Sequence, residues 1–143
     1  AKGLQYSKIY KIKKKIFDFK NTLSEKKIIN ELKENNIDLI CLAGFMKILS
    51  KSFIKKFKGK IINIHPSLLP KYKGLNTHKK ALANKEKFTG CTVHYVNSKL
   101  DSGKIILQRK IKIKKTDNIK TLSAKVLTQE HKLYPAAINK IFN

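Results

Sequence analysis

A nearly continuous apolar segment, Ile37–Gly44, constrains the fold more than any other feature of the sequence. It has the length of a strand and ends at a glycine, and such a run is typical of a buried strand in a parallel sheet. Apolar residues recur at helical spacing on both sides of it. One helix is expected to begin at the capping-box pattern Thr22–Glu25 and to end near Asn36, and another to span residues 45–58. Helices that alternate with strands predict an α/β sheet.

The rest of the chain continues this alternation. Residues 2–20 are lysine-rich with alternating apolar positions, which predicts a short exposed strand with its loops. The hairpin-like order of the last two strands indicates a mixed sheet, and no linker or repeat divides the chain, so residues 1–143 are expected to form one domain. The further strands are predicted at Lys60–His65, Cys91–Val96 and 104–113, and the further helices at Thr77–Asn84 and 118–143, the last with Asp117 as N-cap and a kink at Pro135.

The net charge is +24, from 33 basic and 9 acidic residues. Such a charge raises the question of nucleic acid or an anionic membrane surface. However, Arg109 is the only arginine, and nucleic-acid readers depend on arginine for bidentate contacts. A general enrichment in lysine, spread over the surface, therefore explains the charge better than a binding patch does. A basic nucleic-acid-binding module remains an alternative.

Two cysteines, Cys41 and Cys91, each lie within an apolar run, where a reduced and buried thiol is common. No apolar run is long enough to cross a bilayer, and no signal-peptide pattern opens the chain. We therefore expect a reducing, cytoplasmic location, without a chemical role for either cysteine.

The end of the strand Lys60–His65 is the first place to expect chemistry, because functional groups in α/β sheets collect beyond the carboxyl ends of strands. Side chains alternate along a strand, so Asn63 and His65 project to the same side. An amide and an imidazole there can polarise a carbonyl and move a proton. Asp101 is a scarce acid that either supplies a local turn hydrogen bond or, near His65, favours the imidazolium and orients its ring.

The other histidines carry less weight. His78 begins a helix, His94 alternates within a strand and His131 lies on the last helix, and no pair has zinc-ligand spacing. No metal site is therefore expected. The chain also has no phosphate-binding loop, no dinucleotide fingerprint and no nucleophile elbow.

Taken together, these segments resemble the phosphoribosylglycinamide formyltransferase family over almost the whole chain, with the motifs in the family's order. The matching stretches are 42–50 (LAGFMKILS), 63–72 (NIHPSLLPKY), 74–78 (GLNTH), 92–96 (TVHYV), 100–103 (LDSG), 106–108 (ILQ) and 128–131 (TQEH). The resemblance implies a Rossmann-like formyltransferase fold with a mixed, mainly parallel sheet. It also implies transfer of a formyl group from 10-formyltetrahydrofolate to the amine of glycinamide ribonucleotide.

By this resemblance, His65 is the catalytic acid and base, Asn63 hydrogen-bonds the formyl oxygen, and Asp101 pairs with His65. The turn from Val96 to Asp101 corresponds to the loop that closes over the pterin, and Pro66 and Glu130 correspond to residues that contact the ribonucleotide. The residues expected to bind the folate are Met46, Lys47, Ile48, Leu49, Asn63 and Val96.

The match begins after the family's first strand and its glycine-rich, phosphate-holding loop, so an N-terminally truncated sheet is expected, and with it weak binding of glycinamide ribonucleotide. The partners expected are small molecules, with no membrane, no nucleic acid and a monomer or weak homodimer. Formyltetrahydrofolate hydrolase is the nearest alternative, although Pro66 favours the transferase. Methionyl-tRNA formyltransferase would need a further C-terminal domain.

Overall fold

The computed structural model describes residues 3–18 and 22–143. Contacts divide the chain into two compact units, Ala1–Asn36 and Ile37–Asn143, and each is considered by itself. The prediction of a single domain over 1–143 stays a prediction.

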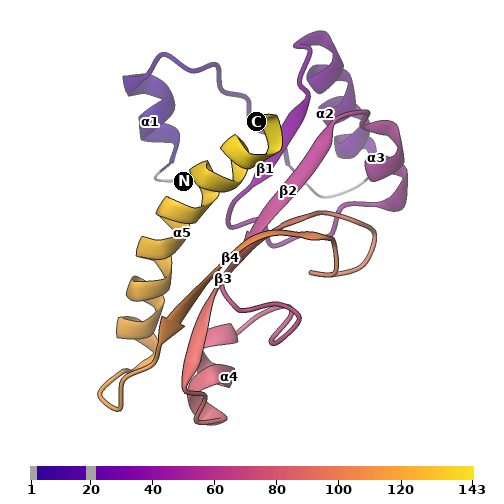
Figure 1. The fold of residues 1–143 in the computed structure, drawn as a ribbon. Helices are drawn as coiled ribbons and strands as arrows, with labels where there is room; N and C mark the ends of the chain where they lie inside the picture. Colours follow the sequence, from indigo (N-terminus) through magenta and orange to yellow (C-terminus); the bar gives the residue numbers. More distant parts are fainter. Residues whose placement is uncertain (1–2, 19–21) are drawn as a thin grey trace. The chain divides into compact units, whose positions relative to one another are not determined.

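The first unit holds two helices, α1 (Leu4–Ile9) and α2 (Thr22–Glu34) (Figure 1). The predicted exposed strand within 2–20 is wrong: a helical turn forms instead, and Tyr6 stacks on Tyr10 with ring centroids 6.5 Å apart, which is the i, i+4 spacing of a helix. Residues 2, 19 and 20 lie outside the described part. The helix α2 begins where it was predicted, but the side chain of Thr22 is not described, so the capping box stays a prediction.

The second unit is built on a four-stranded sheet in the order β1-β2-β3-β4. The pair β1–β2 is parallel, whereas β2–β3 and β3–β4 are antiparallel. The mixed α/β sheet is therefore confirmed, but antiparallel pairings outnumber the parallel one among these strands, contrary to the mainly parallel sheet expected. The strands are β1 (Leu39–Leu42), β2 (Lys60–His65), β3 (Phe88–Tyr95) and β4 (Ile105–Lys112).

Three helices complete this unit: α3 (Lys51–Lys56), α4 (Thr77–Ala83) and α5 (Ile119–Phe142). The helix predicted over 45–58 is too long, because Gly44 has a φ of +62° and the chain stays irregular until Ser50. There the Ser50 side chain accepts from the Phe53 N–H at 3.0 Å and starts α3. The N-cap of α5 is Asn118, not Asp117, and Asn118 forms a capping box with Thr121.

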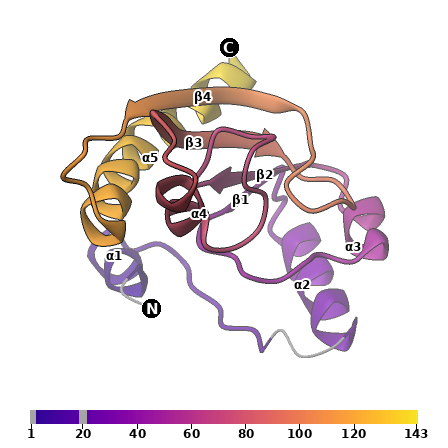
Figure 2. The same cartoon turned by 90° about the horizontal axis from the view of Figure 1, so that it is seen from below.

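The core of this unit lies between α5 and the strands β3 and β4 (Figures 1 and 2). Its largest fully buried side chains are those of Ile62, Leu122, Val93 and Val126. Cys91 is buried as predicted, but Cys41 on the strand β1 is exposed, contrary to the prediction. The hydroxyl of Tyr134 on α5 donates to the Leu42 carbonyl at 2.7 Å and ties the helix to the end of β1.

Candidate active site

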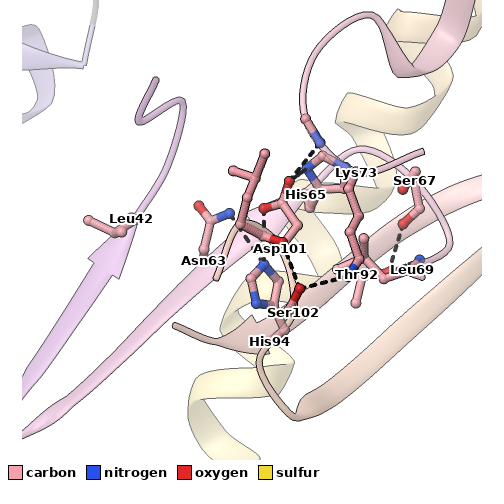
Figure 3. A network of polar contacts seen from close by, with 12 residues as sticks. Leu42, Asn63, His65, Ser67, Leu69, Lys73, Thr92, His94, Asp101 and Ser102 are labelled. Carbon is pink, nitrogen blue, oxygen red and sulfur yellow. Dashed lines mark hydrogen bonds and ion pairs between the residues drawn. The ribbon is translucent and has the colours of Figure 1, made fainter. Parts of the chain in front are cut away.

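The candidate site lies at the carboxyl end of β2, where β3 runs alongside in the opposite direction. The register pairs Asn63 with His94 and His65 with Thr92, so two polar pairs face each other across the strands. The chain then leaves β2 through the loop 66–76, which Pro66 begins and which contains the cis peptide bond before Pro70. Figure 3 shows Asn63, His65, His94 and Asp101 gathered at this point, and we call these four residues the polar cluster.

His65 is held by contacts at both ring nitrogens. Its Nε2 lies 2.8 Å from the carbonyl oxygen of Tyr72, and because a carbonyl only accepts, Nε2 carries a proton. Its Nδ1 lies 3.4 Å from Oδ2 of Asp101, and both side chains are less than a tenth exposed. The carboxylate of Asp101 therefore faces the second ring nitrogen of His65, the one that the Tyr72 carbonyl does not contact.

Asp101 is brought to His65 by a turn that leaves β3 and returns as β4. Its backbone has a φ of +43°, in the left-handed region that Asp tolerates better than most residues. The Gly74 N–H donates to its Oδ2 at 2.8 Å, so the loop 66–76 contacts both members of the pair. At the end of the turn, Gly103 approaches the Tyr95 carbonyl so closely that a Cβ atom would lie 1.6 Å from its oxygen, which excludes any larger residue there.

His94 belongs to the same cluster, although from the sequence alone it has no role beyond its place in the matching stretch 92–96. Its Nδ1 donates to the Tyr95 carbonyl at 2.8 Å, and its Nε2 lies 3.4 Å from Nδ2 of Asn63 and 3.7 Å from Oδ1 of Asp101. Burial lowers the pKa of His94 more than the Tyr95 carbonyl and Asp101 raise it, which favours the neutral ring. That stretch was one signal for His94, and its pairing with Asn63 is another, which depends on the register of β2 and β3.

The loop 66–76 is fastened to the sheet by a buried hydroxyl. Thr92 on β3 donates to the Ser67 carbonyl at 2.7 Å and accepts from the Leu69 N–H at 3.1 Å. Gln108 on β4 donates both to this hydroxyl and to the Leu69 carbonyl. These contacts hold the loop that carries the Tyr72 carbonyl, and so they determine where the ring of His65 can lie.

A pocket opens beside the polar cluster. Of the residues expected to bind folate, Lys47, Ile48, Leu49, Asn63 and Val96 line it, whereas Met46 does not and is 71% exposed. Asn63, His94 and Asp101 border the pocket, but His65 does not. The remaining lining residues are Leu42, Phe45, Asn97, Lys99 and Leu100.

Pro66 and Glu130 do not line this pocket. Pro66 is half-buried next to His65, and Glu130 is half-buried on α5, where burial raises the pKa of its carboxyl. Nδ1 of His78 is buried without a hydrogen-bond partner, and His131 is exposed.

Within 3–18 and 22–143, no group of three or more His, Cys, Asp or Glu side chains is arranged to hold a metal ion. In the same part of the chain, every helix is too short or too polar to cross a bilayer.

The chain resembles known proteins over most of its length. Residues 1–138 match the family model described as formyl transferase. The chain is 44% identical to phosphoribosylglycinamide formyltransferase of Escherichia coli (strain K12), over 80% of this chain and 54% of that protein. It is 51% identical to the human trifunctional purine biosynthetic protein adenosine-3, over 77% of this chain but only 11% of that protein.

Solved structures of phosphoribosylglycinamide formyltransferases are also similar to this chain. The crystal structure of phosphoribosylglycinamide formyltransferase from Bacillus halodurans covers all of this chain with a TM-score of 0.93 at 35% identity, and 76% of that protein is covered. The enzyme of the same name from Brucella melitensis gives a TM-score of 0.91 at 42% identity, over 99% of this chain and 74% of that one.

Proposed function

The chain belongs to the formyl transferase family, and from this premise we propose that it transfers a formyl group from 10-formyltetrahydrofolate to the amine of glycinamide ribonucleotide, a step of de novo purine (IMP) synthesis. The relatives named above support this substrate pair. Because the chain spans only part of their length, 11% of the human protein and 54% of the bacterial one, the activity is a proposal for this chain. The observation that carries it is the gathering of Asn63, His65 and Asp101 beside one pocket.

The reaction needs a hydrogen-bond donor and a proton carrier at the same point. The amine attacks the formyl carbon, a C–N bond forms, and negative charge develops on the formyl oxygen while the nitrogen becomes cationic. The amino group of Asn63 borders the pocket and can donate to that oxygen. The bond from carbon to the folate nitrogen then breaks, and that nitrogen takes up a proton.

We assign the proton transfer to the pair of Asp101 and His65. The carboxylate borders the pocket, and the buried ring lies behind it at 3.4 Å. Such a pair can accept the proton of the attacking amine and return it to the leaving folate nitrogen, so that no net proton is gained or lost. A positioned acid–base pair of this kind typically contributes about a hundredfold to ten-thousandfold in rate.

The folate is proposed to lie in the pocket, against Lys47, Ile48, Leu49 and Val96. Met46 stays part of the proposal as a residue at the rim, where its side chain is exposed. The ribonucleotide is proposed to contact Pro66 and Glu130, which do not line the pocket. The carboxyl of Glu130 has a pKa raised by burial, as is common for groups retained for binding rather than for stability.

A cytoplasmic location is supported by two free cysteines, Cys41 and Cys91, as in a reducing compartment. The monomer or weak homodimer expected from the sequence stays a prediction.

The test is a product assay with a formyl-labelled folate. Purified protein is incubated with 10-formyltetrahydrofolate in the absence of glycinamide ribonucleotide and with a large excess of it, because weak binding of the ribonucleotide is expected. Label is followed into formylated ribonucleotide and into free formate. We expect formylated ribonucleotide and tetrahydrofolate in equal amounts, and little formate without the ribonucleotide. Release of formate regardless of the ribonucleotide would instead assign the chain to the hydrolases.

A further inference from the structure

The hydrogen bond between Asn63 and His94 determines which end of the Asn63 amide faces which partner. Because Nδ1 of His94 donates to the Tyr95 carbonyl at 2.8 Å, a neutral ring has its lone pair on Nε2. Only the amino end of the amide can pair with that lone pair, and Nδ2 of Asn63 lies 3.4 Å from it. The histidine therefore selects one of the two orientations of the amide.

Strand pairing brings the ring of His94 to Asn63. Asn63 is its register partner on β2, and on the other side the β3–β4 register shifts between Val93 and His94, with Ile106 as the extra residue on β4. Irregularities of this kind increase the local twist of a sheet and occur often next to functional sites. The ring of His94 borders the pocket but is only 3% exposed, so the surrounding atoms restrict its movement.

The orientation of the Asn63 amide decides whether a donor or an acceptor faces the pocket. An amino group has two N–H bonds, so with one donated to His94 the other remains for a ligand in the pocket, where developing negative charge needs a donor. The opposite orientation would place the carbonyl oxygen of Asn63 beside that charge. A protonated His94 would favour this unproductive orientation, because its Nε2–H would need an acceptor and the Asn63 amide, at 3.4 Å, is nearer than Oδ1 of Asp101 at 3.7 Å. The charged or titratable groups that face His94 are Asp101 and His65, and burial of the ring outweighs the carboxylate of Asp101.

We propose that His94 is a positioning residue that, as a neutral ring with Nε2 unprotonated, fixes the Asn63 amide with its amino group available to the pocket. The catalytic part of this inference depends on the proposed function, whereas the tautomer and the hydrogen bond do not. Two substitutions separate the two ends of the ring. His94→Asn keeps a donor near the position of Nδ1 but has no acceptor near Nε2, and His94→Gln places an amide oxygen near Nε2.

The first test does not depend on whether the protein transfers formyl groups. Nitrogen-15 NMR of the histidine rings in the purified protein at neutral pH should show His94 protonated at Nδ1 alone, and the side-chain amide signals of Asn63 should shift in His94→Asn much more than in His94→Gln. A ring protonated at Nε2, or Asn63 signals that ignore both substitutions, would overturn the inference whether or not the protein transfers formyl groups.

The second test is a double-mutant cycle on formyl transfer. We expect His94→Asn to lower kcat by about 10- to 100-fold with little change in the KM for folate. His94→Gln should lower kcat clearly less. In an Asn63→Ala background, His94→Asn should cost nothing further, because its effect passes through the amide. An equal loss in both backgrounds would mean that His94 acts through Asp101 or the fold, and would refute the positioning role.

Discussion

The carboxylate of Asp101 faces two buried histidine rings. A substitution by asparagine removes its charge and nearly keeps its shape. Asp101→Asn keeps an oxygen that can accept from the Gly74 N–H but removes the negative charge opposite His65. We expect formyl transfer to fall by about a hundredfold or more, with folate affinity and melting temperature close to those of the unchanged protein.

A matched control is Asp117→Asn. Asp117 also holds a cation, Lys125 at 2.6 Å, but it lies at the start of α5 and not at the pocket. This substitution should lower the melting temperature and leave the rate unchanged. Equal rates for Asp101→Asn and the unchanged protein would remove Asp101 from the mechanism.

Glu130 should make the protein less stable at neutral pH than at acid pH. Burial raises the pKa of its folded-state carboxyl, so its protonated form is favoured by folding below the unfolded pKa, and this contribution is lost as the pH rises through the folded pKa. Glu130→Gln is therefore expected to raise the melting temperature at pH 7 and to have little effect near pH 4. Thermal denaturation at the two pH values measures both effects.

Glu86 provides a control of opposite sign. Hydrogen bonds from Lys71 and Tyr72 lower the pKa of its carboxyl, so its contribution to stability is present at neutral pH and lost as the pH falls. Glu86→Gln should lower the melting temperature at pH 7 and not near pH 4. The same sign of change for both variants at pH 7 would contradict the environments described here.

At the scale of elements, the loop 66–76 makes two of its hydrogen bonds to the sheet through the buried hydroxyl of Thr92. Thr92→Val keeps the volume but leaves the Leu69 N–H without its acceptor, at a cost of about 1–3 kcal/mol. Because the loop carries the Tyr72 carbonyl that holds His65, we expect kcat to fall as well. Urea denaturation and steady-state kinetics measure the two effects.

An exposed threonine serves as the control for that substitution. The hydroxyl of Thr128 bonds to the Ala124 carbonyl on the surface of α5. Thr128→Val should change the free energy of unfolding by less than about 0.5 kcal/mol. If Thr92→Val behaves in the same way, the loop is held by other contacts.

Elements with strong local signals could be predicted from the sequence. The predicted strand Lys60–His65 matches β2 at both ends, and β3, β4, α4 and α5 lie within three residues of their predicted bounds at either end. The helix over 45–58 could not be predicted correctly, because the apolar spacing continues through a segment that Gly44 and Ser50 keep irregular. Periodicity alone does not report where a chain must turn to line a pocket.

The polar cluster was predictable only in part, for a related reason. Asn63 and His65 could be placed on one side of a strand by alternation alone, and Asp101 was associated with them by the family resemblance. His94 could not be added, because its partner is set by the antiparallel register of β2 and β3. Contacts across strands depend on tertiary pairing, which the sequence of either strand does not contain.

At the scale of the whole molecule, the net charge of +24 destabilises the folded state, and the salt dependence of the melting temperature measures this effect. Only 9 acidic residues are available to offset 33 basic ones, so the folded state carries strong self-repulsion. We expect the melting temperature to rise as sodium chloride is increased from low to near-physiological ionic strength, where charges about 10 Å apart become screened. A melting temperature that falls with salt would indicate that ion pairs dominate instead.

The most direct test of the account is the rate of formyl transfer by His65→Ala, measured beside its affinity for the folate. His65 contacts Asp101 but does not line the pocket, so its loss should leave folate binding nearly intact. We predict that turnover falls by at least about a hundredfold while the folate dissociation constant changes little. Unimpaired turnover by His65→Ala would contradict the assignment of this cluster as the catalytic site.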